Sequence, residues 1–248
     1  MKDYVYDGSF EGLLTAIYEA YYRKEIPNRL VSQDTYQISL ISQRILIETD
    51  EEKAQKVFHS IETKISKEAL KKILYVYFSD LEERGTYIYH YLKLGWKIGQ
   101  EVDQYLGNDS VLRIHQIYQR VNKERHFMLG LIRFRELQNN ILYAPVEPQY
   151  NILGLVAPHF VNRMPQENWM IHDLRRSIGA MYNKKEWVIG EVNIGGEVPL
   201  GEEECRYQKL WKSYFKHISI ENKRNIKLQK SNMPMKYWKH LIEMSVDL

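Results

Sequence analysis

The periodicity of the sequence changes at about residue 131, and this change constrains the fold more than any other feature. Over residues 50–125 apolar residues recur at helical spacing, with Asp50 and Ser66 as N-caps and the Asn-Asp-Ser tripeptide at 108–110 opening a long helix. Beyond residue 131 the apolar runs are short and typical of strands. A helical half followed by strands predicts an α+β protein.

The strand-like region has the order hairpin, helix, hairpin. A Gln-Asn-Asn turn at 138–140 divides the first hairpin, and an apolar stretch containing Pro158 separates it from the second. This order predicts a central antiparallel sheet of four or five strands with a helix on one face. The expected strands lie at 131–137, 141–148, 169–171, 178–182 and 187–190, and the helix lies at 151–161.

The N-terminal half is predicted to begin with a short strand at 4–6, followed by a turn and a helix. Asp7, Gly8 and Ser9 supply turn and N-cap chemistry, but they lack the glycine spacing of a nucleotide-binding fingerprint. Further along, Gly85 is predicted to break the helical pattern. The tyrosines of this half recur at helical spacing, which favours packing over a base-stacking platform.

The C-terminal segment is predicted to form amphipathic helices that bury aromatic side chains and present lysines. After the Glu202–Glu204 run, one arc carries apolar residues and the opposite arc carries Lys209, Lys212 and Lys216. A last helix opened by Pro234 repeats the plan. The expected buried residues are Trp211, Tyr214, Phe215, Ile218, Tyr237, Trp238, Leu241 and Ile242.

The length of 248 residues suits one large domain or two small ones. The patterns divide the chain into an N-terminal strand and helical region (1–107), a long helix with the sheet core (108–200), and a basic C-terminal helical segment (201–248). We expect these three regions to form one compact unit.

Charge is distributed unevenly along the chain. Residues 1–110 hold 14 Lys and Arg against 18 Asp and Glu, whereas residues 111–248 hold 21 against 14. Between Arg206 and His240 there are ten basic residues and a single acidic one, Glu221. Such asymmetry points to an anionic partner, with nucleic acid the leading candidate, while the alternative is an ordinary solvated face.

The start of the chain and its cysteine content indicate a reducing compartment. The first residues, MKDYVYDGSFEG, carry charge where a signal peptide needs an apolar run, and no apolar stretch is long enough to span a membrane. Cys205 is the only cysteine, which excludes an internal disulfide and a zinc site built from several cysteines. We therefore expect a cytoplasmic protein without a membrane partner.

Four segments stand out as motifs: ERHFMLGLIRFRE (124–136), APVEPQYN (144–151), HFVNRMPQENWMIHDLRR (159–176) and YQKLWKSYFKHISIENKRNIKLQKSNMPMKYWKHLIE (207–243). Together with a weaker match at YDGSFEGLL, they resemble a bacterial family of unknown function that is catalogued as a probable DNA metabolism protein. The resemblance implies a partnership with a radical S-adenosylmethionine (radical SAM) protein in DNA modification or repair. Related domains are fused to a uracil-DNA-glycosylase-like domain.

The resemblance carries over no catalytic residues, because the family has none assigned. A single cysteine also cannot hold the iron–sulfur cluster of a radical enzyme, so that chemistry would belong to the partner. We expect no cofactor in this chain.

The arginine pairs are the first candidates for nucleic-acid contact. In the run 171–176, strand alternation puts Asp173 and Arg175 on one face, where they would form an ion pair that leaves Arg176 free for a phosphate. Arg133 and Arg135 likewise share a strand face. The full predicted binding set is Arg133, Arg135, Arg175, Arg176, Lys212, Lys216, Lys223, Arg224, Lys227, Lys236 and Lys239. The alternatives are charged turn residues at the first pair and pairing with acids of the N-terminal half at the second.

A metal-dependent nuclease is the first rival function. Glu136, Glu147, His159, His172 and Asp173 lie on neighbouring predicted elements, but no ligand spacing distinguishes them and no residue is assigned to a metal. His172 and Asp173 are a poor catalytic pair, because adjacent strand residues point to opposite faces. We expect a DNA-binding accessory protein of DNA repair or base modification. The alternatives are a nuclease or base-processing enzyme, and a protein-interaction module for the radical SAM enzyme.

Overall fold

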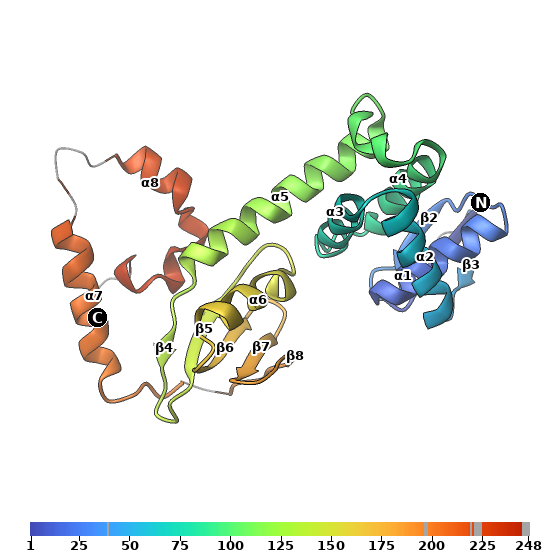
Figure 1. The fold of residues 1–248 in the computed structure, drawn as a ribbon. Helices are drawn as coiled ribbons and strands as arrows, with labels where there is room; N and C mark the ends of the chain where they lie inside the picture. Colours follow the sequence, from blue (N-terminus) through green and yellow to red (C-terminus); the bar gives the residue numbers. More distant parts are fainter. Residues whose placement is uncertain (39, 196–197, 219, 221–224, 245–248) are drawn as a thin grey trace. The chain divides into compact units, whose positions relative to one another are not determined.

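The computed structural model describes residues 1–248 except 39, 196–197, 219, 221–224 and 245–248. Helices and strands are mixed, as the predicted α+β class requires. The chain divides into two compact units, Met1–Asn122 and Lys123–Leu248, and the division falls inside the long helix α5 (Asp109–Leu131) (Figure 1).

The first unit begins with a small parallel sheet. Strand β1 (Lys2–Tyr6) lies between β2 (Arg29–Ser32) and β3 (Gln43–Leu46). The predicted strand, turn and helix at the start are confirmed, since Ser9 Oγ accepts a hydrogen bond from Gly12 N at 2.9 Å and caps α1 (Phe10–Tyr22). The two flanking strands were not predicted, because β3 is a short, mostly exposed run without alternation.

Besides the first part of α5, the first unit contains α2 (Glu51–Lys64), α3 (Lys67–Tyr77), α4 (Arg84–Ile98) and the 3₁₀ turn η1 (Gln100–Gln104). The predicted N-caps are confirmed, because Asp50 and Ser66 accept hydrogen bonds from the third residue beyond each. The prediction that Gly85 breaks the helical pattern is wrong. Gly85 lies inside α4, where a Cβ atom would meet the carbonyl oxygen of Leu30 at 2.6 Å, so glycine allows the helix to approach β2.

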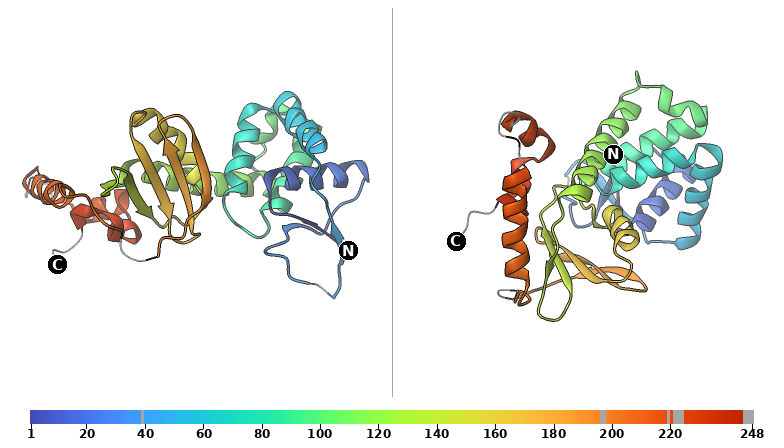
Figure 2. Two further views of the ribbon diagram at one scale, coloured as in Figure 1. Left: turned by 90° about the horizontal axis from the view of Figure 1, so that it is seen from below. Right: turned by 60° about the vertical axis from the view of Figure 1, so that its left-hand side comes forward.

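The second unit is built on a five-stranded sheet with the order β4-β5-β6-β7-β8. Its strands are β4 (Arg135–Glu136), β5 (Leu142–Val146), β6 (Asn168–Asp173), β7 (Ile178–Asn183) and β8 (Trp187–Glu191). The helix α6 (Leu153–Arg163) packs on one face of this sheet in both views of Figure 2. An aromatic cluster of Phe134, Phe160, Trp169 and Tyr182 fills the space around it.

The predicted hairpins are confirmed as antiparallel pairs, but the first predicted strand, 131–137, is wrong in extent, because α5 runs to Leu131 and β4 covers only Arg135–Glu136. Arg133 therefore does not share a strand face with Arg135. The prediction of a wholly antiparallel sheet is also wrong. The pairs β4–β5, β6–β7 and β7–β8 are antiparallel, whereas β5 and β6 run parallel. The reason is α6, which carries the chain back across the sheet, so that β6 begins at the same end as β5.

The C-terminal segment forms α7 (Glu204–Ile218), α8 (Ile226–Asn232) and the 3₁₀ turns η3 (Met235–His240) and η4 (Ile242–Met244). The last predicted helix is therefore two short turns, although Tyr237, Leu241 and Ile242 are buried as expected. None of the helices that the structure describes has the length and apolar content needed to cross a bilayer.

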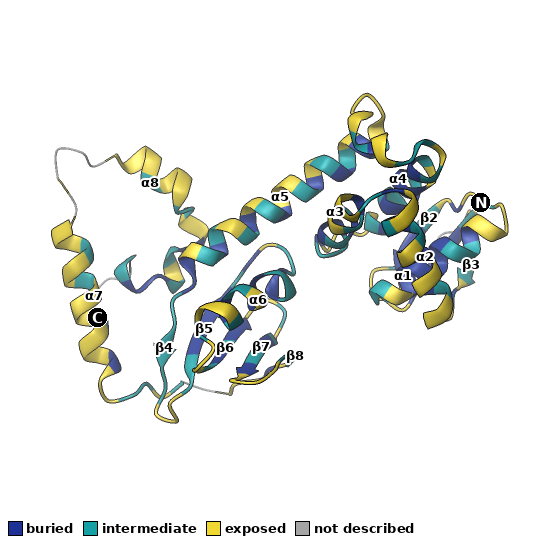
Figure 3. Ribbon diagram, in the orientation of Figure 1, coloured by how far each residue is buried: buried dark blue, intermediate teal, exposed yellow. Residues whose placement is uncertain are grey.

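The prediction that α7 buries its aromatic side is wrong. Trp211, Tyr214 and Ile218 are 39%, 55% and 58% exposed, and Figure 3 shows α7 largely in the colour of exposed residues. Amphipathic spacing fixes which side chains share a face, but it does not supply the surface that would cover that face.

A polar network joins η1 to the helices of the first unit. Asp103 receives Lys72 Nζ at 2.7 Å, Tyr91 Oη at 2.9 Å and His115 Nε2 at 2.9 Å. Burial opposes ionisation of this carboxyl group, but the hydrogen bonds from these three side chains hold its pKa below the usual value.

We predict that Asp103→Asn lowers the free energy of unfolding by roughly 2 kcal/mol at pH 7, because Lys72 loses its charged partner. A carboxyl group with a depressed folded pKa stabilises the protein above its unfolded pKa of about 3.9, and this stabilisation is lost as pH falls through the folded pKa. Urea unfolding followed by circular dichroism at pH 7 and pH 3 measures both effects. The matched control is Glu101→Gln, an exposed acid of the same turn; an equal loss in the control contradicts the assignment.

Candidate functional site

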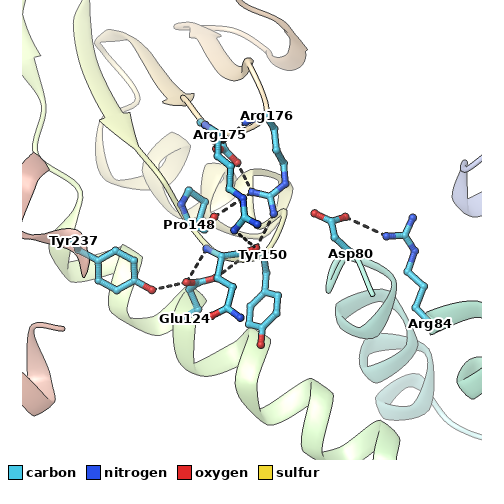
Figure 4. Close-up of polar contacts among 10 residues, drawn as sticks. Asp80, Arg84, Glu124, Pro148, Tyr150, Arg175, Arg176 and Tyr237 are labelled. Carbon is cyan, nitrogen blue, oxygen red and sulfur yellow. Dashed lines mark hydrogen bonds and ion pairs between the residues drawn. The ribbon is translucent and has the colours of Figure 1, made fainter. Parts of the chain in front are cut away.

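A buried carboxylate, Glu124, organises the second unit. Its side chain is only 4% exposed, and its oxygens accept hydrogen bonds from Gln149 N at 2.9 Å and Tyr150 N at 2.8 Å. Lys236 Nζ lies 2.9 Å from Oε1. The hydroxyl of Tyr237 donates to the same oxygen (Figure 4). One side chain of α5 thereby holds both the loop after β5 and the C-terminal turns.

Tyr237 is fixed as a hydrogen-bond donor in this arrangement. Burial raises the pKa of its hydroxyl well above the ordinary value, and the hydrogen bond to Glu124 raises the pKa further. Lys236 Nζ also lies 4.6 Å from the centre of the Tyr237 ring, in the range of a cation–π contact.

Arg176 holds the loop from the other side. Its Nη1 lies 2.8 Å from Oδ2 of the fully buried Asp173, and it donates to the carbonyl oxygens of Pro148 at 3.2 Å and, through Nη2, of Gln149 at 2.8 Å. The predicted pair of Asp173 with Arg175 is therefore wrong. Strand β6 ends at Asp173 and the chain turns, so the carboxylate accepts from Arg175 N at 3.0 Å rather than from its guanidinium.

Two further cations contact the same stretch, residues 147–150, which we call the 147–150 loop. Lys239 Nζ forms an ion pair with Glu147, and the exposed Arg175 reaches the carbonyl oxygen of Gln149 through Nη1 at 3.4 Å. The hydrogen bond from Lys239 holds the pKa of Glu147 below its usual value, although burial opposes this shift. We call Arg175, Arg176, Lys236 and Lys239 the loop cations.

The structure thus gathers four of the predicted nucleic-acid-binding residues around one loop and places the others elsewhere. Arg133 forms an ion pair with Glu243, Nη2 to Oε1 at 2.6 Å, and lies over the ring of Trp211. Arg135 lies on β4, and its Nε is buried with no hydrogen-bond partner among the described residues. Lys212 and Lys216 lie on α7 and Lys227 on α8, whereas Lys223 and Arg224 lie outside the described residues.

The acidic and histidine candidates for catalysis are not brought together in one site. His172 Nδ1 lies 2.9 Å from the hydroxyl of Tyr143, and burial lowers its pKa. The backbone N–H of Glu136 donates to Glu204 at 2.9 Å, while Glu147 and Asp173 hold the cations described above. His159 Nε2 is buried without a partner among the described residues. That part of the chain contains no group of three or more His, Cys, Asp or Glu placed to hold a metal ion.

Sequence reasoning missed Glu124, which lies in a long helix among basic residues and shows no motif of its own. A signal was nonetheless present. Glu124 belongs to ERHF, the loop to APVEPQYN, Asp173 and Arg176 to MIHDLRR, and Tyr237 to MPMKYWK. Motifs that are far apart in the sequence and meet around one buried acid indicate a shared structural or functional requirement.

A family model described as a domain of unknown function, DUF4130, covers residues 82–243, which include α4 to η3 and every contact of the 147–150 loop. No curated protein matches the chain.

We predict that Glu124→Gln destabilises the second unit by about 2–4 kcal/mol, because Lys236 loses its charged partner and the amide cannot accept from every donor around it. Hydrogen–deuterium exchange is expected to speed up at 233–244 and 147–150 together. The control is Glu167→Gln, an exposed acid of the same unit, which should leave exchange unchanged. Faster exchange at only one of the two segments contradicts the role of Glu124 as their common anchor.

Proposed function

The chain belongs to the DUF4130 family, and from that premise we propose that it is a cytoplasmic DNA-binding accessory protein of DNA repair or base modification. The proposal also draws on the resemblance of its motifs to a probable DNA metabolism family and on the charge of residues 111–248, where basic residues exceed acidic ones by seven. Its partner would be a radical SAM protein, which would supply the chemistry.

The gathering of the loop cations around the 147–150 loop is the observation that carries the proposal. These side chains come from two distant motifs, and their anchors leave donor capacity for a ligand. Lys236 and Lys239 are 50% and 54% exposed, and an ammonium group with one acidic partner retains further N–H donors. Arg175 is exposed and makes only one long contact with the loop.

The chemistry of this cluster suits phosphate rather than base edges. Guanidinium groups bind phosphate oxygens in bidentate fashion, and lysines contribute point charges. Contacts of this kind position a protein on the backbone and carry no sequence information. We therefore propose binding without base specificity, with dissociation constants typical of non-specific complexes, roughly 10⁻⁴ to 10⁻⁶ M at physiological salt.

A specific observation favours a second candidate function, a protein-interaction module. The residues Tyr207, Leu210, Trp211, Tyr214 and Ile218 recur at helical spacing on α7, and we call them the α7 stripe. All five are exposed, and all but Ile218 border an open groove of about 840 Å³ that also includes Phe134 and Ile242. An exposed apolar stripe of this length is typical of a surface that binds another protein.

The enzyme alternative has no comparable observation in its favour. Of its four weak candidates, the side chains of Glu147, His172 and Asp173 are held in separate contacts, and Glu136 is held through its backbone N–H. Cleavage of plasmid DNA with Mg²⁺ or Mn²⁺ that Glu136→Gln abolishes would nevertheless establish it. Glu136→Gln is a cleaner test than Asp173→Asn, because the latter also releases Arg176.

We predict that duplex DNA binding weakens steeply with salt. Four phosphate contacts correspond to a slope of roughly −3.6 in log K against log salt, or a loss of roughly a hundredfold between 50 and 200 mM. Arg175→Gln should reduce the slope by about 0.9 and weaken binding roughly tenfold at 50 mM salt. Fluorescence anisotropy with a labelled duplex measures both quantities.

The matched control removes the same charge from the same unit. Lys185→Gln, in the exposed turn between β7 and β8, should leave the slope and the affinity unchanged. Binding that is insensitive to salt, or equal losses in the two variants, contradicts DNA contact at the loop cations.

For the second candidate, we predict that Leu210→Ser with Tyr214→Ser weakens binding to the radical SAM protein of the same genome by about tenfold, because both side chains lie in the exposed α7 stripe. Nuclease-treated pull-down and titration of the purified pair measure this. Val188→Ser, which changes an exposed apolar residue on β8, is the control. Equal binding by all variants excludes α7 as the interface.

A further inference from the structure

A recess on the first unit is lined by aromatic rings. Tyr18, Tyr21 and Tyr22 come from the C-terminal half of α1, and Trp96 comes from α4. The rings of Tyr18 and Tyr22 are stacked with their centres 4.2 Å apart, and Tyr21 meets Trp96 edge to face at 5.2 Å. One face of α2, which carries Val57 and Ser60, completes the recess.

Two of these aromatic side chains are largely exposed to solvent. Tyr21 and Tyr22 are 52% and 66% exposed, although they lie next to each other and to other rings. The indole Nε1 of Trp96 is closed to solvent and has no hydrogen-bond partner among the described residues. Accessible aromatics around a recess, with polar groups left unpaired, are the usual make-up of a ligand site.

The rim of the recess is basic. Lys56 and Lys64 lie on the same face of α2, one turn on either side of Ser60, and both are exposed. Within the described part of the chain neither ammonium group forms an ion pair, and no carboxylate is among the lining residues. An aromatic cage without lysines would suit a cation. Two unpaired lysines repel a cation and attract an anion, so the recess suits a planar ring that carries negative charge.

The volume limits the ligand further. The recess holds about 140 Å³, well below the range of about 300–1,000 Å³ typical of pockets for drug-sized ligands. It therefore has room for one ring system, with any charged group lying at the rim.

We propose that this recess is a nucleotide-binding site, in which one base stacks on the exposed ring of Tyr21 beside Trp96 and its phosphate lies between Lys56 and Lys64. The ligand is a nucleoside monophosphate, either free or as an end or unstacked residue of a strand. The site goes beyond the proposed duplex contact, because it belongs to the first unit, and α1 and α2 lie outside the residues that the family model covers.

The test uses the full chain and isothermal titration with dAMP, deoxyadenosine and inorganic phosphate. We expect dAMP to bind best, deoxyadenosine about tenfold more weakly, and phosphate weakest, because the site needs both a ring and a charge. Tyr21→Ala should weaken dAMP and deoxyadenosine alike by about 5–30-fold, the loss expected for one stacking contact.

A double variant, Lys56→Gln with Lys64→Gln, separates the charge from the ring. It should reduce dAMP binding to the level of deoxyadenosine and leave deoxyadenosine itself unchanged. The control is Lys67→Gln, a highly exposed lysine of the same unit at the start of α3, which should bind dAMP like the unchanged protein. Tyr21 and both lysines are exposed, and circular dichroism checks that each variant is folded.

Two comparisons identify the source of the ligand and separate this proposal from the previous one. A 5′-phosphorylated trinucleotide that binds at least tenfold more tightly than its mononucleotide indicates a strand, and equal affinities indicate a free nucleotide. Arg175→Gln should leave dAMP binding intact even where it weakens duplex binding. The proposal is overturned if the folded protein binds no dAMP at millimolar concentration, or if Tyr21→Ala and the double lysine variant bind dAMP like the unchanged protein.

Discussion

The second unit depends on the burial of one carboxylate. Moving an ionised carboxyl group out of water costs several kcal/mol unless hydrogen bonds and opposite charge replace its hydration. Glu124 meets this requirement with two backbone N–H groups, one ammonium and one hydroxyl, and these donors come from two segments distant in the sequence. The loop after β5 and the C-terminal turns are therefore positioned by the same carboxylate. Glu124 can be buried only when both segments are in place to donate hydrogen bonds to it.

This constraint determines how the cations of the unit are presented. Arg176 is fixed by Asp173 and two carbonyl groups, Lys236 by Glu124, and Lys239 by Glu147. A flexible cation loses conformational entropy when it binds phosphate, whereas an anchored one has lost much of that freedom on folding. Each anchoring carboxylate also partly neutralises the charge of its cation. The anchors therefore fix the positions of the loop cations but weaken their electrostatic attraction for phosphate.

The sequence predicts the features of this structure that depend on residues close together in the chain, and it fails for those that depend on residues far apart. The caps at Ser9, Asp50 and Ser66 and the three antiparallel pairs of the second sheet depend on neighbours in the chain, and they were predictable. The parallel pairing of β5 with β6 depends on the path of α6, and the contacts of Glu124 with Lys236 and Tyr237 join residues more than 100 positions apart, so local patterns could not reveal them. The Asp173 pair failed for a related reason, since strand alternation does not extend past the end of β6. The exposure of the α7 stripe depends on whether another segment covers it, and the spacing of apolar residues within one helix does not predict that.

The charge balance at the 147–150 loop limits how tightly the loop cations alone could bind DNA. Three of the four loop cations already contact an acid of their own unit, so each phosphate must compete with a carboxylate for a cation that is only partly available. Such a surface gains less from counterion release than four unpaired cations would.

Tight association with DNA would then require a further contact, either from another surface of this chain or from a bound partner. The exposed apolar side chains of α7 provide a surface of the latter kind within the same unit, and weak phosphate contact combined with a protein contact would multiply the two affinities through effective concentration. In the proposed accessory role, DNA contact and partner binding would therefore be complementary, because three of the four loop cations are anchored and partly neutralised by acids of their own unit.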